Sequence, residues 1–341
     1  MSEIRQLDGV VKAYAWGSKS VLAGNRGNKN SEHPEAELWF GDFPNGKLPI
    51  LAKILAVVQT LSLQVHPNKS QVGKFSELFS DANHKPEMLV ALSDFYALIG
   101  IAGESEIIET INSIGSKSVS NFLIPKIENE NSISDLLNIV LGAPDELNLI
   151  PDLIGNLQKV ENPTDRQSWT LEVANCYPKR LDVLATLLCN FVKLSPGQAI
   201  YVPPRTIHAY LNGTGVEIMA ASGNVVRGGL TLKPIDLKLF LEIADVSAKS
   251  LESYLIAPEE LAIGKSWRAP DLELLQLPLS DGPKSQLIST ETVAFVWGGQ
   301  AVLRVMDEES SITIGGDLGA IIPTGRFEYS GTGSLWLASQ G

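Results

Sequence analysis

The order of apolar and polar residues predicts a mainly β protein with one helical segment. Leu48 to Leu63 is almost all apolar and gives way to Gln64-Val-His66-Pro, which is typical of a buried strand that ends at a polar site. From Glu104 to about Lys159 the apolar spacing becomes helical, as Ile107, Ile108, Ile111 and Ile114 show. Ser132-Ile-Ser-Asp135 resembles a capping box, which favours a further helix there. We therefore expect a helical insert between two β regions.

Beyond Thr186 the chain returns to short apolar segments, separated by Pro-Gly, Pro-Pro, Asn-Gly and Gly-Gly turns. This alternation is typical of a β-sandwich or jelly roll. A weak internal echo supports a duplicated unit, since Gly197 to Pro203 and Gly213-Thr-Gly215 are mirrored by Gly316 to Pro323 and Gly331-Thr-Gly333. Chance similarity between glycine-rich β segments is the competing explanation. If the echo is real, the first roll carries the chemistry, because the later copy has no histidine.

Length and composition indicate an ordinary globular protein with more than one domain. The chain has 341 residues, of which 44% are hydrophobic and 19% charged, so it can bury a sizeable core. The formal net charge of -12 argues against binding to nucleic acid or to an anionic membrane surface, since both need clustered Lys and Arg. Any anionic substrate must therefore be met by a local group of cations.

Nothing in the sequence predicts export or membrane insertion. There is no run of about 18 apolar residues, and Met1 to Leu7 lacks the charged-then-apolar order of a leader. The two cysteines, Cys176 and Cys189, have neither metal-site spacing nor the density of a disulfide framework, which suits a reducing compartment. We therefore expect a cytoplasmic protein without cysteine chemistry. Its oligomeric state cannot be predicted from the sequence.

Only four histidines are present, so a metal site in this chain needs other ligand types as well. Strand alternation places Ser62, Gln64 and His66 on one face, and Leu61, Leu63 and Val65 on the other. Taken alone, a Gln-x-His pair is more often part of a solvated strand face than a pair of ligands. The segment Asn83-His84-Lys85-Pro86-Glu87 presents a carboxylate directly after a stiff proline, and alone it is an ordinary surface loop.

A third segment, Pro203-Pro-Arg-Thr-Ile-His208-Ala-Tyr210, delivers a histidine from a rigid corner onto a following strand. Alone, His208 is equally well interpreted as a satisfied core histidine. Two imidazoles, one carboxylate and one amide oxygen from these three segments would hold a divalent ion. Such an ion can accept water or substrate oxygens and act as a Lewis acid.

A fourth segment, Val216 to Lys233, carries a carboxylate and an arginine. Strand alternation separates Glu217 from its apolar neighbours. Arg227 stands between two valines and two glycines, where the backbone can approach a ligand closely. Considered alone, Arg227 is more often an ordinary surface arginine than a ligand-binding residue.

These segments resemble the type I mannose-6-phosphate isomerases, a cupin-type family. The family's Gln-x-His-Pro, His-Lys-Pro-Glu, Pro-x-x-x-x-His-Ala-Tyr and Asn-Val-Val-Arg-x-Gly-Leu-Thr motifs stand here at Gln64 to Pro67, His84 to Glu87, Pro203 to Tyr210 and Asn224 to Thr231. The similarity begins at Tyr14-Ala-Trp16-Gly17 and Ala36-Glu-Leu-Trp39 and continues to Lys233. Two positions depart from the pattern: Gly223, where the family usually has Asp, and Leu232, where Pro is common.

The resemblance implies roles for individual residues. Its metal ligands correspond to Gln64, His66, Glu87 and His208, with one zinc ion per chain, and its active-site arginine corresponds to Arg227. The remaining candidates are Glu217 and Lys85 for acid-base chemistry, and Ser62, Lys85, Lys233 and Trp16 for substrate binding. We favour Glu217 as the base, while Lys85 is placed either to transfer a proton or to bind phosphate.

The resemblance also implies a fold, namely cupin-type jelly rolls that are mainly β with a helical insert. Because motifs on both sides of the insert must share one site, we expect it to interrupt the catalytic roll. The expected boundaries are residues 1–101 and 181–255 for the catalytic roll, 102–180 for the helical insert, and 256–341 for a smaller C-terminal jelly-roll-like β-domain.

The implied function is the interconversion of mannose 6-phosphate and fructose 6-phosphate through an enediol-like state, so a small sugar phosphate is the expected partner. A divalent ion and Arg227 would both stabilise the negative charge that develops on oxygen. A non-catalytic metal-containing cupin that binds a sugar phosphate is the alternative, and a cupin oxygenase is a third option. The extra ligand Gln64 and the presence of Arg227 argue against an oxygenase, which usually needs two His and one carboxylate around iron.

Overall fold

Strand β4 (Ile50–Val57) lies inside the first of two antiparallel sheets in the computed structural model, which describes residues 3–41, 48–128, 133–306 and 310–341. All eight residues of β4 are buried, as expected for an apolar strand that is covered on both faces. The prediction of one strand from Leu48 to Leu63 is wrong in its length. Gln59 and Thr60 interrupt the apolar run, and a separate strand, β5 (Leu63–Val65), follows them.

One long strand, β10 (His208–Ala220), belongs to both halves of the first sheet. We call this sheet the roll. Its first residues pair with β5 and β7 (Phe95–Ile101), and its later residues pair with β4 and β6 (Glu87–Ala91). A register shift between Tyr210 and Asn212 marks the passage from one face to the other. The remaining strands of the roll are β2 (Val10–Lys12), β3 (Glu37–Phe40), β8 (Cys189–Leu194), β9 (Ala199–Val202), β11 (Val226–Gly229) and β12 (Leu255–Ile256).

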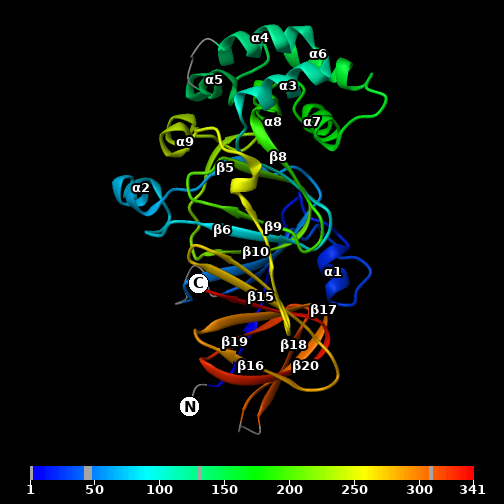
Figure 1. Ribbon diagram of the computed structural model, residues 1–341, viewed down its shortest axis with the longest axis vertical. Coiled ribbons are helices and arrows are strands. Elements are labelled where there is room, and N and C mark those ends of the chain that lie inside the picture. The colour runs from blue at the N-terminus through cyan, green and yellow to red at the C-terminus, as the bar shows by residue number, and fades with distance from the viewer. Residues whose placement is uncertain (1–2, 42–47, 129–132, 307–309) are drawn as a thin grey trace.

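Helices form the connection between β7 and β8 and cover one end of the roll (Figure 1). They are α3 (Glu104–Ile114), α4 (Lys117–Glu128), α5 (Ile133–Val140), α6 (Leu149–Leu157), α7 (Asp165–Cys176) and α8 (Ala185–Leu188), with a 3-10 turn η2 (Leu181–Leu184). As the helical spacing predicted, Ile107, Ile111 and Ile114 are buried on one side of α3. Because β7 and β8 are paired neighbours, the helical segment leaves and re-enters the roll at adjacent strands. The predicted cap at Ser132 lies outside the described residues.

Short helices also lie outside this segment. They are α1 (Val21–Asn25), α2 (Lys69–Lys74) and α9 (Leu237–Ile243), with 3-10 turns η1 (Ser76–Leu78) and η3 (Leu251–Ser253). In the part of the chain that the structure describes, no helix is long and apolar enough to span a membrane.

A second antiparallel sheet, which we call the C-terminal β region, lies at the opposite end of the roll from the helices (Figure 1). Its strands are β13 (Glu259–Leu261), β14 (Gly264–Ala269), β15 (Leu272–Pro278), β16 (Lys284–Ile288), β17 (Thr292–Val305), β18 (Ser311–Gly315), β19 (Leu318–Ile322) and β20 (Gly325–Ser339), together with β1 (Arg5–Asp8), which pairs with β19. Phe40 of the roll stacks on Phe295 of this region with ring centroids 4.9 Å apart. The two sheets therefore share an apolar core.

Two antiparallel sheets and one helical segment confirm the predicted fold class, mainly β with helices inserted between strands. The division of the chain into domains at residues 102, 181 and 256 stays a prediction.

Candidate metal centre

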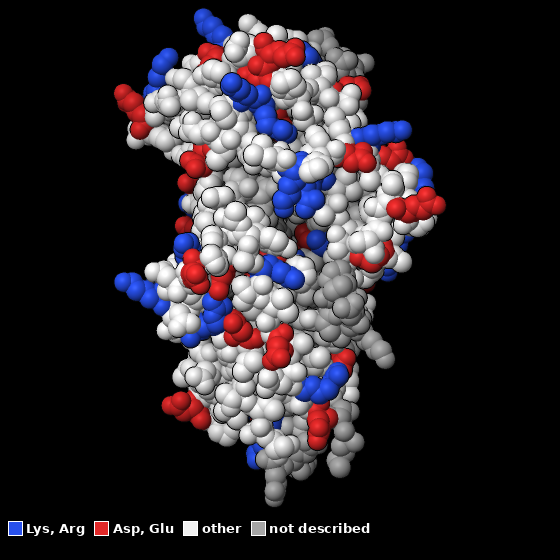
Figure 2. Space-filling view, turned by 180° about the vertical axis from the view of Figure 1, so that it is seen from behind, with Lys and Arg blue, Asp and Glu red and all other residues white. Residues whose placement is uncertain are grey.

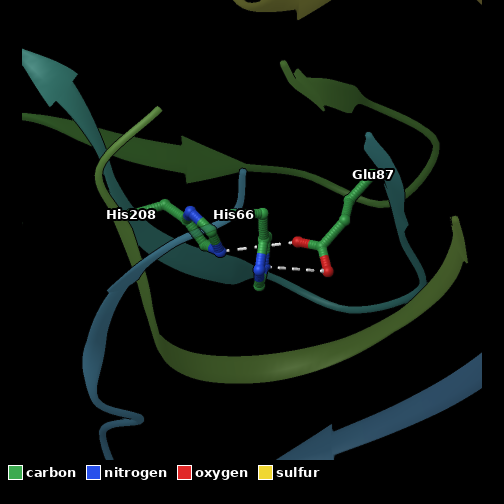
Figure 3. Close-up of side chains that lie close together, drawn as sticks. All are labelled: His66, Glu87 and His208. Carbon is green, nitrogen blue, oxygen red and sulfur yellow. Dashed lines mark ion pairs between the residues drawn. The ribbon is translucent and has the colours of Figure 1, made fainter. Parts of the chain in front are cut away.

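Three buried side chains, His66, Glu87 and His208, converge inside the roll (Figure 3). His66 directly follows β5, Glu87 begins β6 and His208 begins β10, which pairs with both other strands. His66 Nε2 lies 3.3 Å from Glu87 Oε1, and His208 Nε2 lies 3.4 Å from Glu87 Oε2. Each residue is at most 2% exposed. Strand pairing thus brings together three segments that lie far apart in the sequence.

Each imidazole makes a hydrogen bond to a backbone carbonyl through its Nδ1. His66 Nδ1 donates to Asn224 O at 2.7 Å, and His208 Nδ1 donates to Thr206 O at 2.9 Å. Because Nδ1 carries the proton in both rings, Nε2 offers a lone pair toward Glu87. Burial, followed by the charge of Lys85, lowers the pKa of His66 to about 4, so this ring is neutral at pH 7.

The atoms that face the centre include two without a hydrogen-bond partner among the described residues, His66 Nε2 and Glu87 Oε2. A buried polar atom left in this way costs about 1 to 3 kcal/mol, so two at one point need a common partner. Burial alone would raise the pKa of Glu87, but nearby positive charge, above all that of Lys85, holds it well below its usual range. Lys85 Nζ lies 3.0 Å from Glu87 Oε1. Two imidazoles and an ionised carboxylate form a donor set that fits Zn²⁺.

Gln64 lies beside these three side chains. β5 pairs Gln64 with His208 of β10 on one side and with Arg227 of β11 on the other, so the three residues form a row across the sheet. The side-chain nitrogen of Gln64 lies 3.2 Å from His208 Nε2, and its Oε1 lies 3.5 Å from Ser62 Oγ. Turning the amide over exchanges its oxygen and nitrogen, which directs Oε1 to the metal centre.

Arg227 is partly buried and, among the residues that the structure describes, pairs with no carboxylate. Its charge partly offsets the rise that burial causes in the pKa of Tyr14. The Tyr14 ring stacks on Trp16 at 5.7 Å between centroids, and Lys233 Nζ lies 5.8 Å from the Tyr14 ring. Trp16 and Lys233, two of the residues predicted from the sequence, thus lie beside Tyr14.

Glu217 lies in the interior of the roll, where it is 3% exposed. Tyr210 donates its hydroxyl to Glu217 Oε1 at 2.9 Å, and Lys53 Nζ lies 3.3 Å from Glu217 Oε2. Burial, and then the charge of Glu87, raise the pKa of Glu217 to about 6. Neither Lys53 nor Tyr210 was predicted from the sequence as a partner of Glu217. A signal for Lys53 was present, since it is the one charged residue within an apolar strand.

The surface around this part of the molecule carries both signs of charge. Figure 2 shows acidic and basic side chains mixed over one face, with basic side chains in and beside a hollow near its middle. Close to the metal centre the cations are Lys53, Lys85 and Arg227. Lys53 and Lys85 are paired with Glu217 and Glu87, so Arg227 is the cation of these three that is available to an anionic ligand.

Comparison with known proteins agrees with this geometry. Residues 40–102 match a family model described as phosphomannose isomerase type I, catalytic domain. The chain is 30% identical over 317 residues to mannose-6-phosphate isomerase from Rattus norvegicus. The aligned region covers 73% of this chain and 74% of that protein. A crystal structure of a variant of phosphomannose isomerase from Salmonella typhimurium has a TM-score of 0.86 at 28% identity, over 99% of this chain and 100% of that one. A structure described as mannose 6-phosphate isomerase bound with zinc and yttrium has a TM-score of 0.84 at 27% identity, with the same coverage.

Proposed function

The chain belongs to the type I phosphomannose isomerase family, and we propose that it interconverts mannose 6-phosphate and fructose 6-phosphate at the centre formed by His66, Glu87 and His208. The observation that carries the proposal is that these three side chains converge with two buried atoms that lack hydrogen-bond partners among the described residues. We assign one zinc ion to this centre, with Gln64 as the fourth ligand. A related structure described as bound with zinc supports the choice of metal.

The isomerisation moves a proton from C2 of the open-chain sugar to C1, while a proton leaves O2 and another is added to O1. Negative charge therefore develops on oxygen in the enediol-like state. A zinc ion in this donor set would supply a Lewis acid that polarises oxygen without redox side reactions. The chain itself must hold the sugar, move the proton and stabilise the charge.

Arg227 is the residue that we assign to charge stabilisation. Its guanidinium has no carboxylate partner among the described residues, and it lies next to Gln64 in the row of side chains across β10, β5 and β11. A preorganised cation that is not neutralised by the protein stabilises an oxyanion most strongly when the surroundings exclude water.

Glu217 is the carboxylate that we assign as the base. A pKa of about 6 is close to neutral pH, where a general base works best, and Tyr210 and Lys53 hold its two oxygens in place. Lys85 is the second acid-base candidate and also a candidate contact for phosphate. Its ammonium is held against the ligand carboxylate of Glu87.

Substrate binding is assigned to residues at the outer side of the centre. Trp16 and its stacked neighbour Tyr14 present aromatic faces, on which the apolar side of a sugar ring can pack. Lys233 lies against Tyr14 and is exposed, so its ammonium can meet a phosphate group. Ser62 lies beside Gln64 and can bind a sugar hydroxyl.

The test is a coupled assay of the full-length protein with mannose 6-phosphate, before chelation, after chelation and after return of zinc. Activity should disappear with the metal and return with it, and elemental analysis should find about one zinc per chain. His208→Ala should lose most zinc and roughly 10³-fold or more in turnover, since a Lewis acid contributes several kcal/mol. Full turnover by metal-free protein would refute the proposal. Zinc binding and sugar-phosphate binding without turnover would favour the non-catalytic alternative.

A further inference from the structure

We infer that Asn224 is a positioning residue, which locks the loop before Glu87 onto the loop before Arg227 and thereby places His66 and Glu87 at one point. The inference rests on the proposed metal site and assigns to Asn224 the task of bringing two of its ligands together. Asn224 is 2% exposed and belongs to none of the described strands or helices.

The side chain of Asn224 uses its full capacity for hydrogen bonds. Oδ1 accepts from Ser80 N at 2.9 Å and from Ser80 Oγ at 3.1 Å. Nδ2 donates to Asp81 O at 2.9 Å, to Asp81 Oδ1 at 3.1 Å and to Asn83 O at 2.8 Å. A buried amide that is satisfied on both sides holds the facing backbone in one arrangement.

The loop that contains Asp81 also makes hydrogen bonds to the residues before Asn224. Asp81 Oδ2 accepts from Gly223 N at 2.7 Å, and Asp81 Oδ1 accepts from Ser222 Oγ at 2.9 Å. Ser222 Oγ in turn accepts from Asn224 N at 3.2 Å. Residues 80–83 and 222–224 therefore form a closed set of hydrogen bonds, which we call the clasp.

The clasp connects to two of the proposed ligands, His66 and Glu87, and to Arg227. Asn224 O accepts the Nδ1 proton of His66, which sets the ring orientation. Residue Asn83 is separated from Glu87 by only three residues, and Asn224 is separated from Arg227 by two. Metal ligands must lie within about 0.2 Å of their ideal distances, so small shifts of these loops would misplace them.

A purely structural role for Asn224 predicts a different outcome from a positioning role. If Asn224 only stabilises the fold, its loss lowers the unfolding temperature and leaves the zinc affinity of the folded protein unchanged. If it positions ligands, the zinc affinity falls in protein that is still folded.

The experiment measures the zinc affinity of the full-length protein by competition with a chromogenic chelator, and the unfolding temperature of the zinc-free protein by circular dichroism. Asn224→Ala should weaken zinc binding by about 10- to 100-fold, as is typical when a group that orients a ligand is removed. Asp81→Asn, which removes one charge from the clasp, should act in the same direction by a smaller factor. The control is Gln167→Ala in α7, where another buried amide donates to a backbone carbonyl, Ser113 O, outside the metal centre.

Gln167→Ala should lower the unfolding temperature while its zinc affinity stays within about twofold of the wild type, because it touches no ligand. Wild-type zinc affinity in folded Asn224→Ala would overturn the inference. If Asn224→Ala does not fold, the zinc affinity of Asp81→Asn becomes the test. An unchanged zinc affinity in Asp81→Asn would also overturn the inference. Failure of the wild-type protein itself to bind zinc would instead refute the proposed metal site.

Discussion

The roll and the C-terminal β region are both built from antiparallel strands, yet they bury different kinds of side chain. Inside the roll, Lys53, Glu87 and Glu217 are each at most 6% exposed. In the C-terminal β region the core contains aromatic side chains such as Phe327 and Tyr329, and its buried polar residues among those described are Ser266 and Thr292.

This difference indicates that the C-terminal β region contributes mainly to stability, whereas the roll also carries the groups that do chemistry. Removing a charge from water costs several kcal/mol even after relaxation, so buried charges are poor stabilisers and usually mark a functional site. Burying an aromatic or aliphatic side chain contributes about 1.5 to 3 kcal/mol in the favourable direction. We conclude that the C-terminal β region, joined to the roll through the stack of Phe40 on Phe295, adds apolar burial to a roll whose interior holds buried charges beside its own apolar core.

The largest effects that test this difference between the roll and the C-terminal β region come from removing one aromatic ring from each. Phe327→Ala and Phe95→Ala should each lower the free energy of unfolding by about 3 to 5 kcal/mol, because both rings are fully buried. Only Phe95→Ala should also lower the turnover of folded protein, since this ring packs against Tyr210, which donates to Glu217. Urea unfolding and turnover per folded molecule measure the two effects. Equal losses of turnover in both variants would contradict this difference.

Arg227, which pairs with no carboxylate in the described part of the chain, should matter for turnover rather than for stability. Arg227→Ala should fold and keep zinc, yet lose roughly 10² to 10³ in turnover, or about 3 to 4 kcal/mol, because it removes a contact that strengthens in the transition state. Arg227→Lys should recover only part, since an ammonium lacks the planar fork of donors. Steady-state kinetics decides the matter. Near-normal turnover with a raised KM would instead make Arg227 a residue that binds substrate and transition state equally.

Buried charge in the roll should also make stability depend on pH. The pKa of Glu217 is raised from its ordinary value of 4.5 to about 6, so the folded protein binds this proton more tightly than the unfolded chain. The resulting stability is fully present below pH 4.5 and is lost as the pH rises through 6. A shift of this size corresponds to about 2 kcal/mol. In zinc-free protein, the stability of Glu217→Gln relative to wild type should therefore rise by about 2 kcal/mol between about pH 4 and 7. A constant difference in urea unfolding would show that Glu217 is not shifted.

The smallest effect is expected at the turn that leads into β10. Arg205 has a φ of 77°, and Thr206 N donates to Pro203 O, so Arg205 occupies a turn position that favours glycine or asparagine. Its Nε donates to Ile243 O at 3.1 Å. Both Arg205→Gly and Arg205→Ala lose this bond, but only glycine relieves the backbone. The glycine variant should be more stable than the alanine variant by about 1 kcal/mol in thermal or urea unfolding. Equal stability would mean that Arg205 is unstrained.

Features that depend on local spacing were predictable from the sequence. The period of two around Gln64 predicted that Leu61, Leu63 and Val65 share one face. Leu63 and Val65 are buried in the core beneath the helices, whereas Leu61 precedes β5 and is partly buried against a different cluster. The helical spacing of Ile107 and Ile111 identified the buried side of α3 in the same way. The strand that begins at His208 was also predicted correctly.

Partners across the sheet were not predictable in this way. Lys53 faces Glu217 because β4 pairs with β10 in one particular register, and Asn224 reaches His66 through a loop that has no periodic pattern. Register is set by the whole sheet and its turns rather than by neighbouring residues. The grouping of Gln64, His66, Glu87 and His208 as ligands came from resemblance to a family, since spacing alone left each with an ordinary explanation.

The position of β10 in the chain has a consequence for biosynthesis. β4, β5, β6 and β7 all pair with β10, which is made only after the whole helical segment. At a synthesis rate of roughly 5 to 20 residues per second, β4 waits on the order of ten seconds for its partner. The helices form through local contacts during that interval, while β4 can pair with β3 along one edge but lacks β10 along the other. The nascent chain is therefore most exposed to aggregation, and most in need of a chaperone, until residue 220 has left the ribosome.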